Sequence, residues 1–507
     1  MPLSALSPLD QQERVTPSTH DSKQAEDIRS KIAPAFRWVI SAKLCIQLLS
    51  WVATLVVVRI LQPSDYGINA MAMAVVGIAT LLAEFGVGTV TVQHPNLKRE
   101  TLQTLFLFTL VFHSVLFLAV LACTPLMIGF FSEPRLAWLL PVAALQFPIL
   151  AWYSIPNALL ERQMRFREKS IADIVGTTLG IIATLTLALS GMGYWALIAG
   201  TLVTTLTRVI WINSIVDWPK RPLWVRSESE RTLKFASALM FSRVTWLAQA
   251  QSDVFIIGRM LGTQSVGLFS VASEIALAPL MKFSAPISSV VVAAASRFQS
   301  DRAELARFTQ NTAHGVALFA FPIFWGVSVV ADVMIPLLFG EHWAAAGPIV
   351  SLIAIAGPIR AMNIAWMAAI TATGQSKPQA RIGTIACAVF PLSLVSGAWM
   401  HGLVGAAAAF SLAVPLFFFY IACEVRKAMG FSVVFQIKPM ILPALAAALM
   451  AGAVVLISRS LPSDGLARLL PEIGVGVVTY LAAVRIMSRQ SFELLINQAL
   501  FWRKRRK

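Results

Sequence analysis

The sequence predicts an all-α integral membrane protein with about fourteen transmembrane helices. The 507-residue chain is 57% hydrophobic and only 13% charged, and its mean hydropathy is +0.72. A soluble protein of this length does not need so much apolar surface. At about 20 residues per crossing plus short loops, the chain accommodates about twelve to fourteen helices.

Fourteen apolar segments are each long enough to cross a hydrocarbon core of about 30 Å. In chain order they are 33–60, 67–92, 102–124, 136–158, 171–190, 193–216, 234–259, 267–293, 307–338, 344–372, 381–400, 402–423, 440–458 and 468–487. The ninth segment exceeds a single straight span. We therefore expect Pro322 to kink it and Pro336 to end it.

Positive charge alternates between the loops. Short loops after every second helix carry Lys98, Arg99, Arg162, Arg165, Arg167, Lys169, Lys220, Arg221, Arg297, Arg302, Lys377, Arg381, Arg426, Lys427 and the tail Arg503–Lys507. The opposite loops carry only Arg135, Arg459 and Arg468, with Arg59 and Arg259 at helix ends. By the positive-inside rule the rich side is cytoplasmic. Both termini then lie in the cytoplasm, which requires an even number of crossings and agrees with fourteen.

An internal repeat divides the chain into two lobes. Arg59, Leu61 and Gly67 recur as Arg259, Leu261 and Gly267, and Lys43 maps onto Arg243, always 200 positions apart. Six helices per repeat make the two lobes parallel, a design that usually flanks a central cavity. The expected parts are a tail at 1–31, an N-lobe at 32–216, a linker at 217–233, a C-lobe at 234–430, two extra helices at 431–487 and a basic cytoplasmic tail at 488–507.

Several function classes are excluded or disfavoured. The net charge of +16 lies mostly in short loops, so membrane topology explains it better than a nucleic-acid partner does. Four scattered cysteines suggest neither a disulfide framework nor a metal site. No phosphate-binding G-x-x-x-x-G-K-[ST] loop is present. No outer loop is long enough for the catalytic domain of a polymerase or ligase, so we expect no catalytic residues. The N-terminus has no apparent cleavable signal peptide.

Four cations lie well inside apolar segments: Lys43, Arg243, Lys282 and Arg360. A charge at that depth costs at least about 2.5–3.5 kcal/mol, so it normally faces a cavity, a partner or a pathway. We interpret these four as cavity residues that bind an anionic, diphosphate-bearing cargo. The alternative is that each pairs with an acid or snorkels to the interface.

Three acids at similar depth, Glu84, Asp253 and Glu274, are candidates for coupling to an ion, H⁺ or Na⁺, although structural ion pairs are the favoured explanation. No other cofactor is expected. Arg37 and Arg208 lie near helix ends and are expected to snorkel. Arg59, Gly67, Arg259 and Gly267 are assigned to the hinges of the repeat, where the arginines would act as anchors.

The segment Arg59–Gly67 resembles the R-x-L-x-P-x-D-[FY]-G turn of Wzx-type polysaccharide flippases, in the multidrug/oligosaccharidyl-lipid/polysaccharide exporter superfamily. The segment Asp253–Gly262, at the end of the seventh helix, resembles the same turn, and Ala158–Lys169 is similar to that family's basic loop after the fourth helix. The resemblance covers about residues 33–430. The second hinge departs from the pattern, because it lacks the proline and aspartate of the first.

The resemblance implies a two-lobed, fourteen-helix transporter of the bacterial inner membrane. Such proteins move undecaprenyl-diphosphate-linked oligosaccharides from the cytoplasmic to the periplasmic leaflet for surface polysaccharide synthesis, and they are not enzymes. A monomer is expected, with a polysaccharide polymerase and export machinery as candidate partners. The alternative is a multidrug exporter of the same superfamily, which the excess of buried cations disfavours because an exporter of cationic drugs would be expected to have an acidic cavity.

Overall fold

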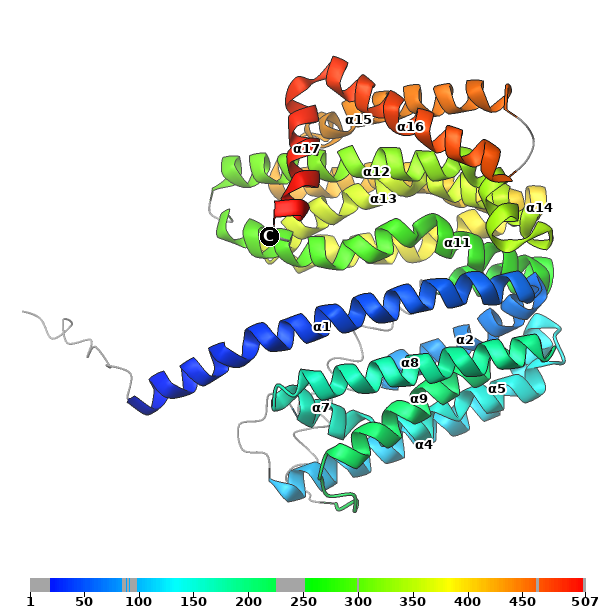
Figure 1. Cartoon of the computed structure of the whole chain (residues 1–507), viewed down its shortest axis with the longest axis vertical. Coiled ribbons are helices and arrows are strands. Elements are labelled where there is room, and N and C mark those ends of the chain that lie inside the picture. Colours follow the sequence, from blue (N-terminus) through cyan, green and yellow to red (C-terminus); the bar gives the residue numbers. More distant parts are fainter. Residues whose placement is uncertain are drawn as a thin grey trace, which may run out of the picture.

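The computed structural model describes residues 19–83, 88, 91, 98–224, 251–298, 301–461 and 465–504, and within these ranges it leaves out the side chains of 19–37, 282–287, 497–504 and a few single positions. The described chain consists of helices in two bundles that lie side by side (Figure 1). Ten described helices are long and apolar enough to cross a membrane, or eleven if one bent pair counts as a single span. The predicted all-α membrane class is therefore confirmed.

The N-terminal bundle contains the first eight described helices. They are α1 (Thr19–Ile60), α2 (Pro63–Ala83), α4 (Arg99–Phe131), α5 (Leu136–Ala144), α6 (Gln146–Ala151), α7 (Ser154–Arg162), α8 (Phe166–Leu189) and α9 (Trp195–Ile215). The predicted helix 136–158 is wrong as a single element, because it is divided into α5, α6 and α7. Pro141, Pro148 and Pro156 lie in this stretch, and each lacks the N–H that a continuous helix would use.

The C-terminal bundle follows. It contains α11 (Ser252–Ala295), η1 (Ser296–Phe298), α12 (Arg302–Phe339), η2 (Glu341–Ala346), α13 (Gly347–Ala372), α14 (Ser376–Met429), α15 (Val433–Ser458), α16 (Gly465–Met487) and α17 (Arg489–Lys504). The expectation that Pro336 ends its helix is wrong. Helix α12 continues to Phe339, where Gly340 stops it with φ 97° and donates its N–H to the Pro336 carbonyl.

Two of these helices are interrupted, and each covers two of the fourteen predicted helices. The ten candidate spans also leave out α2 and the bent stretch from α5 to α7. Helix α14 has 54 residues, about 81 Å if straight, far more than a bilayer requires. His401 and Gly402 leave helical geometry, and Gly397 then packs against the Gly405 backbone, so the chain folds back on itself. Helix α11 is likewise interrupted at Gly262, with φ 82°.

Helices α8 and α9 pack unusually closely through small residues. A Cβ atom added at Gly180 would lie 1.8 Å from the Thr204 hydroxyl oxygen, and one added at Gly200 would lie 1.8 Å from that of Thr184. Within a bilayer, such small residues allow helices to approach and gain van der Waals contact without a hydrophobic driving force. This contact fixes α9 against α8 and therefore positions the polar side chains between them.

Candidate functional site

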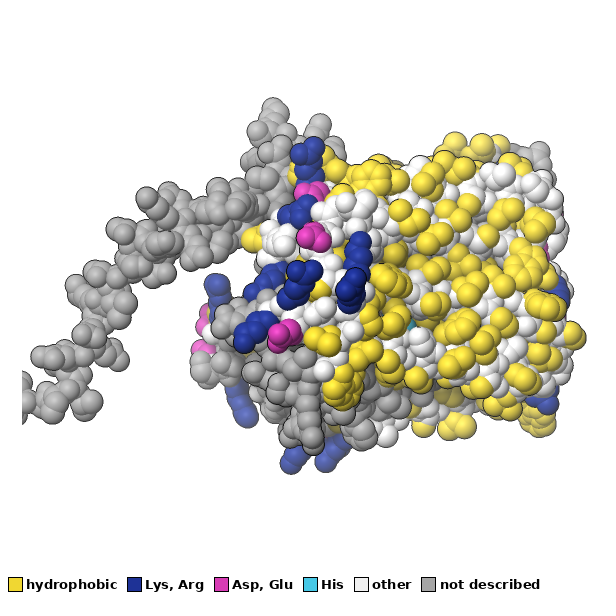
Figure 2. All heavy atoms as spheres, turned by 90° about the horizontal axis from the view of Figure 1, so that it is seen from below, with side chains coloured by type: hydrophobic (Ala, Val, Ile, Leu, Met, Phe, Trp, Pro, Cys, Tyr) yellow, Lys and Arg dark blue, Asp and Glu magenta, His cyan; other side chains and the backbone are white. Residues whose placement is uncertain are grey.

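The two ends of the molecule differ in charge. Figure 2 shows Lys and Arg side chains gathered at one end of the surface, while the adjoining face is mostly hydrophobic. We call this the basic end; the connection between α7 and α8, which carries Arg165, lies there. The opposite, sparse end contains the α1–α2, α4–α5, α8–α9 and α15–α16 connections. Figure 1 shows the bundles converging at the sparse end and diverging toward the basic end.

Among the described residues, two hydrogen bonds join the bundles at the sparse end. The Trp343 indole of η2 is fully buried and donates from Nε1 to the Val58 carbonyl of α1 over 2.8 Å. The Tyr66 ring lies edge-on to the same indole, with centroids 5.4 Å apart. Thr263 Oγ1 of α11 donates to Glu133 Oε2 over 2.7 Å. The bundles are therefore closed against each other at this end.

The Glu133 carboxylate is held in place by Arg135. Two hydrogen bonds of 2.8 Å join the guanidinium to both carboxylate oxygens. The Arg135 hydrogen bonds are the largest cause that lowers the pKa of Glu133 below its usual range, and the Thr263 hydroxyl adds to them. Both residues lie in the connection between α4 and α5, outside the spanning segments. The carboxylate is therefore ionised at neutral pH and accepts across the bundle interface.

The first hinge motif has a clear local structure. Pro63 occupies the first position of α2, and the Asp65 carboxylate accepts from the Gln62 N–H over 3.0 Å. This is half of a capping box, in which the third residue of a helix satisfies the N–H of the N-cap residue. The other Asp65 oxygen accepts from the Tyr194 N–H over 3.1 Å. Asp65 thus joins the α1–α2 turn to the α8–α9 connection.

The second hinge does not reproduce these contacts. Ser265 donates to the Leu261 carbonyl inside its own helix, and Thr263, rather than residue 265, reaches the neighbouring bundle. Arg59 and Arg259 are both exposed at the sparse end.

The structure describes only part of the predicted cation set. Lys43 lies on α1 and its side chain is exposed. Arg243 lies outside the described residues, as does Glu84. Lys282 lies on α11, but its side chain is not described. Glu274, expected to be buried, is exposed.

Arg360 is the predicted cation whose surroundings are best defined. It projects from α13, with its guanidinium carbon 5.4 Å from the centroid of the Phe410 ring of α14. It interacts electrostatically with Asp253 of α11, without a direct ion pair between these two described residues. Asp253 accepts a hydrogen bond from the Val254 N–H over 2.9 Å. The alternative prediction for Arg360 is an ion pair with an acid. The structure shows an electrostatic interaction with Asp253 and no direct ion pair between them.

Helix α13 also carries polar atoms with unused hydrogen-bonding capacity. Within the described part of the chain, Arg360 Nη1, Asn363 Oδ1 and Trp366 Nε1 are buried without a hydrogen-bond partner. Their spacing of three residues places successive members on neighbouring positions of the helix surface. Buried polar atoms normally find partners. Sequence reasoning did not select Asn363, although its spacing from Arg360 could have indicated it.

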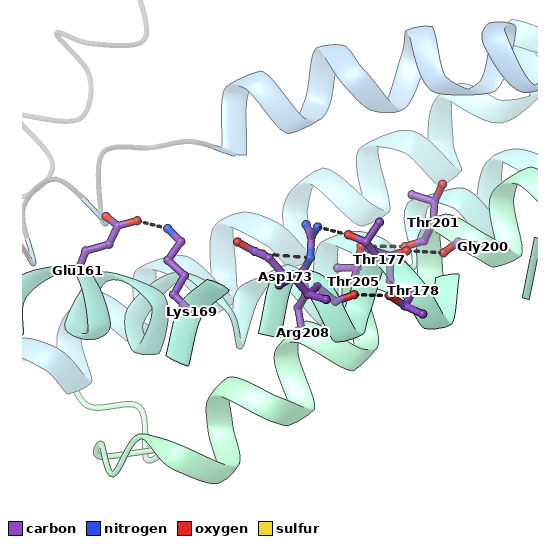
Figure 3. Close-up of polar contacts among 11 residues, drawn as sticks. Glu161, Lys169, Asp173, Thr177, Thr178, Gly200, Thr201, Thr205 and Arg208 are labelled. Carbon is purple, nitrogen blue, oxygen red and sulfur yellow. Dashed lines mark hydrogen bonds and ion pairs between the residues drawn. The ribbon is translucent and has the colours of Figure 1, made fainter. Parts of the chain in front are cut away.

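A second polar cluster lies between α8 and α9 (Figure 3). Arg208 Nε lies 3.2 Å from Asp173 Oδ1, and Arg208 Nη2 donates to the Thr177 hydroxyl over 3.1 Å. Lys169 pairs with Glu161 nearby. The expectation that Arg208 snorkels stays a prediction; the structure adds an acid one helix away that pairs with it. The cluster joins α7, α8 and α9.

An apolar cavity of about 380 Å³ lies between α12, α15 and α16. Its lining includes Ile323, Val330 and Val477. Glu472 is a charged exception, and its carboxylate pairs with Arg468 over 2.9 Å. Among the described residues, no group of three or more His, Cys, Asp or Glu could hold a metal ion.

The fold is that of known transporters. The chain is similar to "Lipid II flippase MurJ, inward closed conformation", with a TM-score of 0.69, 14% identity, and coverage of 89% of this chain and 99% of that one. It is also similar to an inward-facing multidrug resistance MATE family transporter of the MOP superfamily, with a TM-score of 0.55, 13% identity, and coverage of 75% and 96%.

Curated relatives are named for polysaccharide synthesis. The chain is 24% identical to "Succinoglycan biosynthesis transport protein ExoT" of Rhizobium meliloti, over 63% of this chain and 64% of that protein. It is 22% identical to "Lipopolysaccharide biosynthesis protein WzxC" of Escherichia coli, over 76% and 79%. The chain thus spans just under two thirds of the length of ExoT and about four fifths of that of WzxC.

A family described as "Polysaccharide biosynthesis protein" matches residues 56–348, more than half of the chain. The match includes the first hinge, the Glu133–Thr263 contact and the whole of α11 and α12. Together with the apolar helices, it defines a multi-pass protein of the bacterial inner membrane. The chain belongs to the polysaccharide biosynthesis protein family.

Proposed function

We propose that the protein is a flippase that moves undecaprenyl-diphosphate-linked oligosaccharide units from the cytoplasmic to the periplasmic leaflet for surface polysaccharide synthesis. Its membership of the polysaccharide biosynthesis family carries this proposal. Relatives named for succinoglycan transport and lipopolysaccharide synthesis support the same cargo class. The basic end is cytoplasmic by the positive-inside rule, and both termini lie there.

The cargo diphosphate binds to the predicted cations, of which Arg360 lies against α11 and α14 of its own bundle. Arg360 offers a buried guanidinium nitrogen that has no partner among the described residues, and Lys43, Arg243 and Lys282 complete the set. Charge-assisted hydrogen bonds to phosphate are strong, and a low dielectric strengthens them further. When no cargo is bound, the negative charge of Asp253 balances the positive charge of Arg360. The two side chains form no direct ion pair, so the guanidinium stays available to the cargo. Asn363 adds an acceptor for a cargo hydroxyl.

Transport proceeds by alternating access. The bundles are in contact at the sparse end and diverge at the basic end (Figure 1), so cargo enters from the cytoplasm. The prenyl chain stays in apolar surroundings throughout, in the lipid or along the cavity of α12, α15 and α16. An ion, H⁺ or Na⁺, bound at Asp253, Glu84 or Glu274, supplies the bias between states. No covalent bond forms or breaks, and the protein works as a monomer beside a polymerase and export machinery.

Complementation of a flippase-deleted bacterium tests this proposal. We expect Arg360→Ala, and Lys43→Ala, Arg243→Ala and Lys282→Ala in combination with it, to reduce polysaccharide export at normal protein levels. Arg459→Ala is the matched control, since Arg459 is exposed at the sparse end. Normal export by all four single variants and by the combined variant would refute the basic cargo site. Export of cationic drugs without polysaccharide export would instead identify a multidrug exporter.

A further inference from the structure

The two hinge glycines of the repeat contact each other's helices. A Cβ atom added at Gly67 of α2 would lie 1.8 Å from the Thr263 carbonyl oxygen, and one added at Gly267 of α11 would lie 1.7 Å from the Pro63 carbonyl oxygen. Pro63 and Thr263, like Gly67 and Gly267, are 200 positions apart in the sequence. The contact is thus reciprocal, as the crossing of two repeat-related helices on a two-fold axis would be.

Only glycine fits at this crossing. Each added Cβ would overlap a backbone atom of the opposite bundle, and a backbone atom cannot move aside as a flexible side chain can. The bundles would therefore have to separate before a larger residue could be accommodated. Neither glycine is needed for an unusual backbone conformation, since both lie within helices and neither has a positive φ.

The same two helices stay in contact below the crossing. Met71 of α2 and Phe131 of α4 both approach Gly258 of α11, and Gly77 of α2 approaches the Gln251 side chain. From Gly67 to Gly77 the interface extends over ten residues, about 15 Å along the helix axis. That is about half of a hydrocarbon core of ~30 Å. The interface therefore separates the interior from the sparse side.

A hydrogen bond connects the bundles beside the crossing. Thr263, whose carbonyl faces Gly67, uses its hydroxyl to donate to Glu133, and Arg135 holds that carboxylate in place. Its repeat counterpart Pro63 has no hydroxyl, so this lock exists on one side of the two-fold arrangement only. The carboxylate is almost fully buried, which makes loss of its partner costly.

We propose that the Gly67–Gly267 crossing is the gate that closes the translocation path on the sparse side, and that the Thr263–Glu133 hydrogen bond locks it. Opening of the gate separates α2 from α11 and exposes the interior to the far side of the membrane. The proposal rests on the proposed transport function, and it assigns the moving contact to residues that do not bind cargo.

Thiol accessibility in intact cells tests the gate without any cargo. The four native cysteines are replaced, Gln251→Cys is introduced as the reporter, and a membrane-impermeant maleimide is added outside. Gly67→Ala and Gly267→Ala are each expected to raise the labelling rate about 5- to 150-fold. Gly129→Ala is the matched control, because an added Cβ there meets nothing within 4 Å, and it should leave the rate unchanged.

A second variant removes only the lock. Thr263→Val keeps the side-chain shape without the hydroxyl and is expected to fold even where the alanine variants do not. It should raise labelling of the reporter cysteine several-fold, and Glu133→Gln in the same background should add little. Unchanged labelling in the folded glycine variants, or in Thr263→Val, would overturn the gate. If the complementation experiment refuted the cargo site, the labelling results would not change. Failure of the cargo proposal and failure of the gate proposal can therefore be told apart.

Discussion

Trp343→Phe is expected to weaken the closed state of the transporter. The Trp343 indole is fully buried between the bundles and makes a 2.8 Å hydrogen bond to the Val58 carbonyl. Val58 lies in the last turn of α1, where carbonyl groups lack helical partners. Phenylalanine keeps an aromatic ring against Tyr66 but cannot donate. The variant therefore leaves one buried carbonyl without its partner.

An unsatisfied buried acceptor costs about 1–3 kcal/mol. This cost applies to the closed state only, because the open state separates Trp343 from α1. A shift of about 1–3 kcal/mol changes the ratio of the two states by about 5- to 150-fold. If the closed form were about a hundredfold in excess, a loss of ~1.4 kcal/mol would reduce that excess to about tenfold.

Distance measurements between spin labels report this change. Labels at Met192 in the α8–α9 connection and at Ser460 in the α15–α16 connection lie on different bundles at the sparse end. We expect Trp343→Phe in lipid nanodiscs to populate a longer distance that is minor in the parent protein. The measurement needs no cargo and no assumption about the coupling ion.

Trp325→Phe provides the control. Trp325 donates from Nε1 to the Ile355 carbonyl over 3.1 Å, but both residues belong to the C-terminal bundle. Its loss should lower thermal stability without changing the distance between the bundles. If Trp343→Phe lowers thermal stability and leaves the distance distribution as it was, the contact is structural and the reasoning is refuted.

Three further predictions concern the sparse end and the N-terminal bundle. Gly180→Ala should destabilise the protein by about 1–3 kcal/mol in thermal unfolding, because its Cβ would meet the Thr204 hydroxyl; an unchanged midpoint would contradict the close packing. Asp65→Ala should cost a similar ~1–3 kcal/mol by releasing the Tyr194 N–H; Asp65→Asn should recover only part of this, because its amide has one acceptor oxygen, whereas the carboxylate accepts from both the Gln62 and the Tyr194 N–H. The pKa of Glu133 is lowered in the folded protein, so its stabilising effect is complete above the ordinary glutamate pKa of ~4.3 and is lost as pH falls through the lowered folded pKa. External labelling at the gate, divided by the labelling rate of an exposed reporter cysteine at the same pH to correct for the thiolate fraction, should therefore be constant from neutral pH to about 5 and rise only at more acidic pH.

The sequence predicts the membrane class and most helix positions because both follow from local composition. Apolar runs, charged loops and the 200-residue repeat are visible in the chain alone. The C-terminal end of α1 and both ends of α8, α9 and α13 lie close to their predicted positions, whereas α1 begins fourteen residues before the predicted start at 33. Interruptions are harder to predict. Proline divides the segment 136–158 into three helices but is tolerated within α12, because neighbouring contacts decide whether a freed carbonyl is satisfied.

The contacts that the structure shows agree with the predicted site at some residues and differ from it at others. Arg360 was selected for its depth, and the structure places Asp253 of α11 within electrostatic range of it, without a direct ion pair. Arg208 was assigned to the interface because it lies near a helix end, yet Asp173, 35 positions away, pairs with it. Glu133 was not predicted, since a loop carboxylate has no sequence signature until a second bundle supplies Thr263.

By itself the sequence determined that this protein crosses the membrane many times, which end is rich in positive charge, and that Gly67 and Gly267 are equivalent. Those properties depend on hydropathy, charge and spacing, which are written along the chain. Only the tertiary structure shows why both of these equivalent positions must be glycine. Each glycine is needed because a backbone oxygen from the other bundle, about 200 residues away, occupies the place of its missing side chain. Contacts between such distant segments depend on packing, and packing has no local signal.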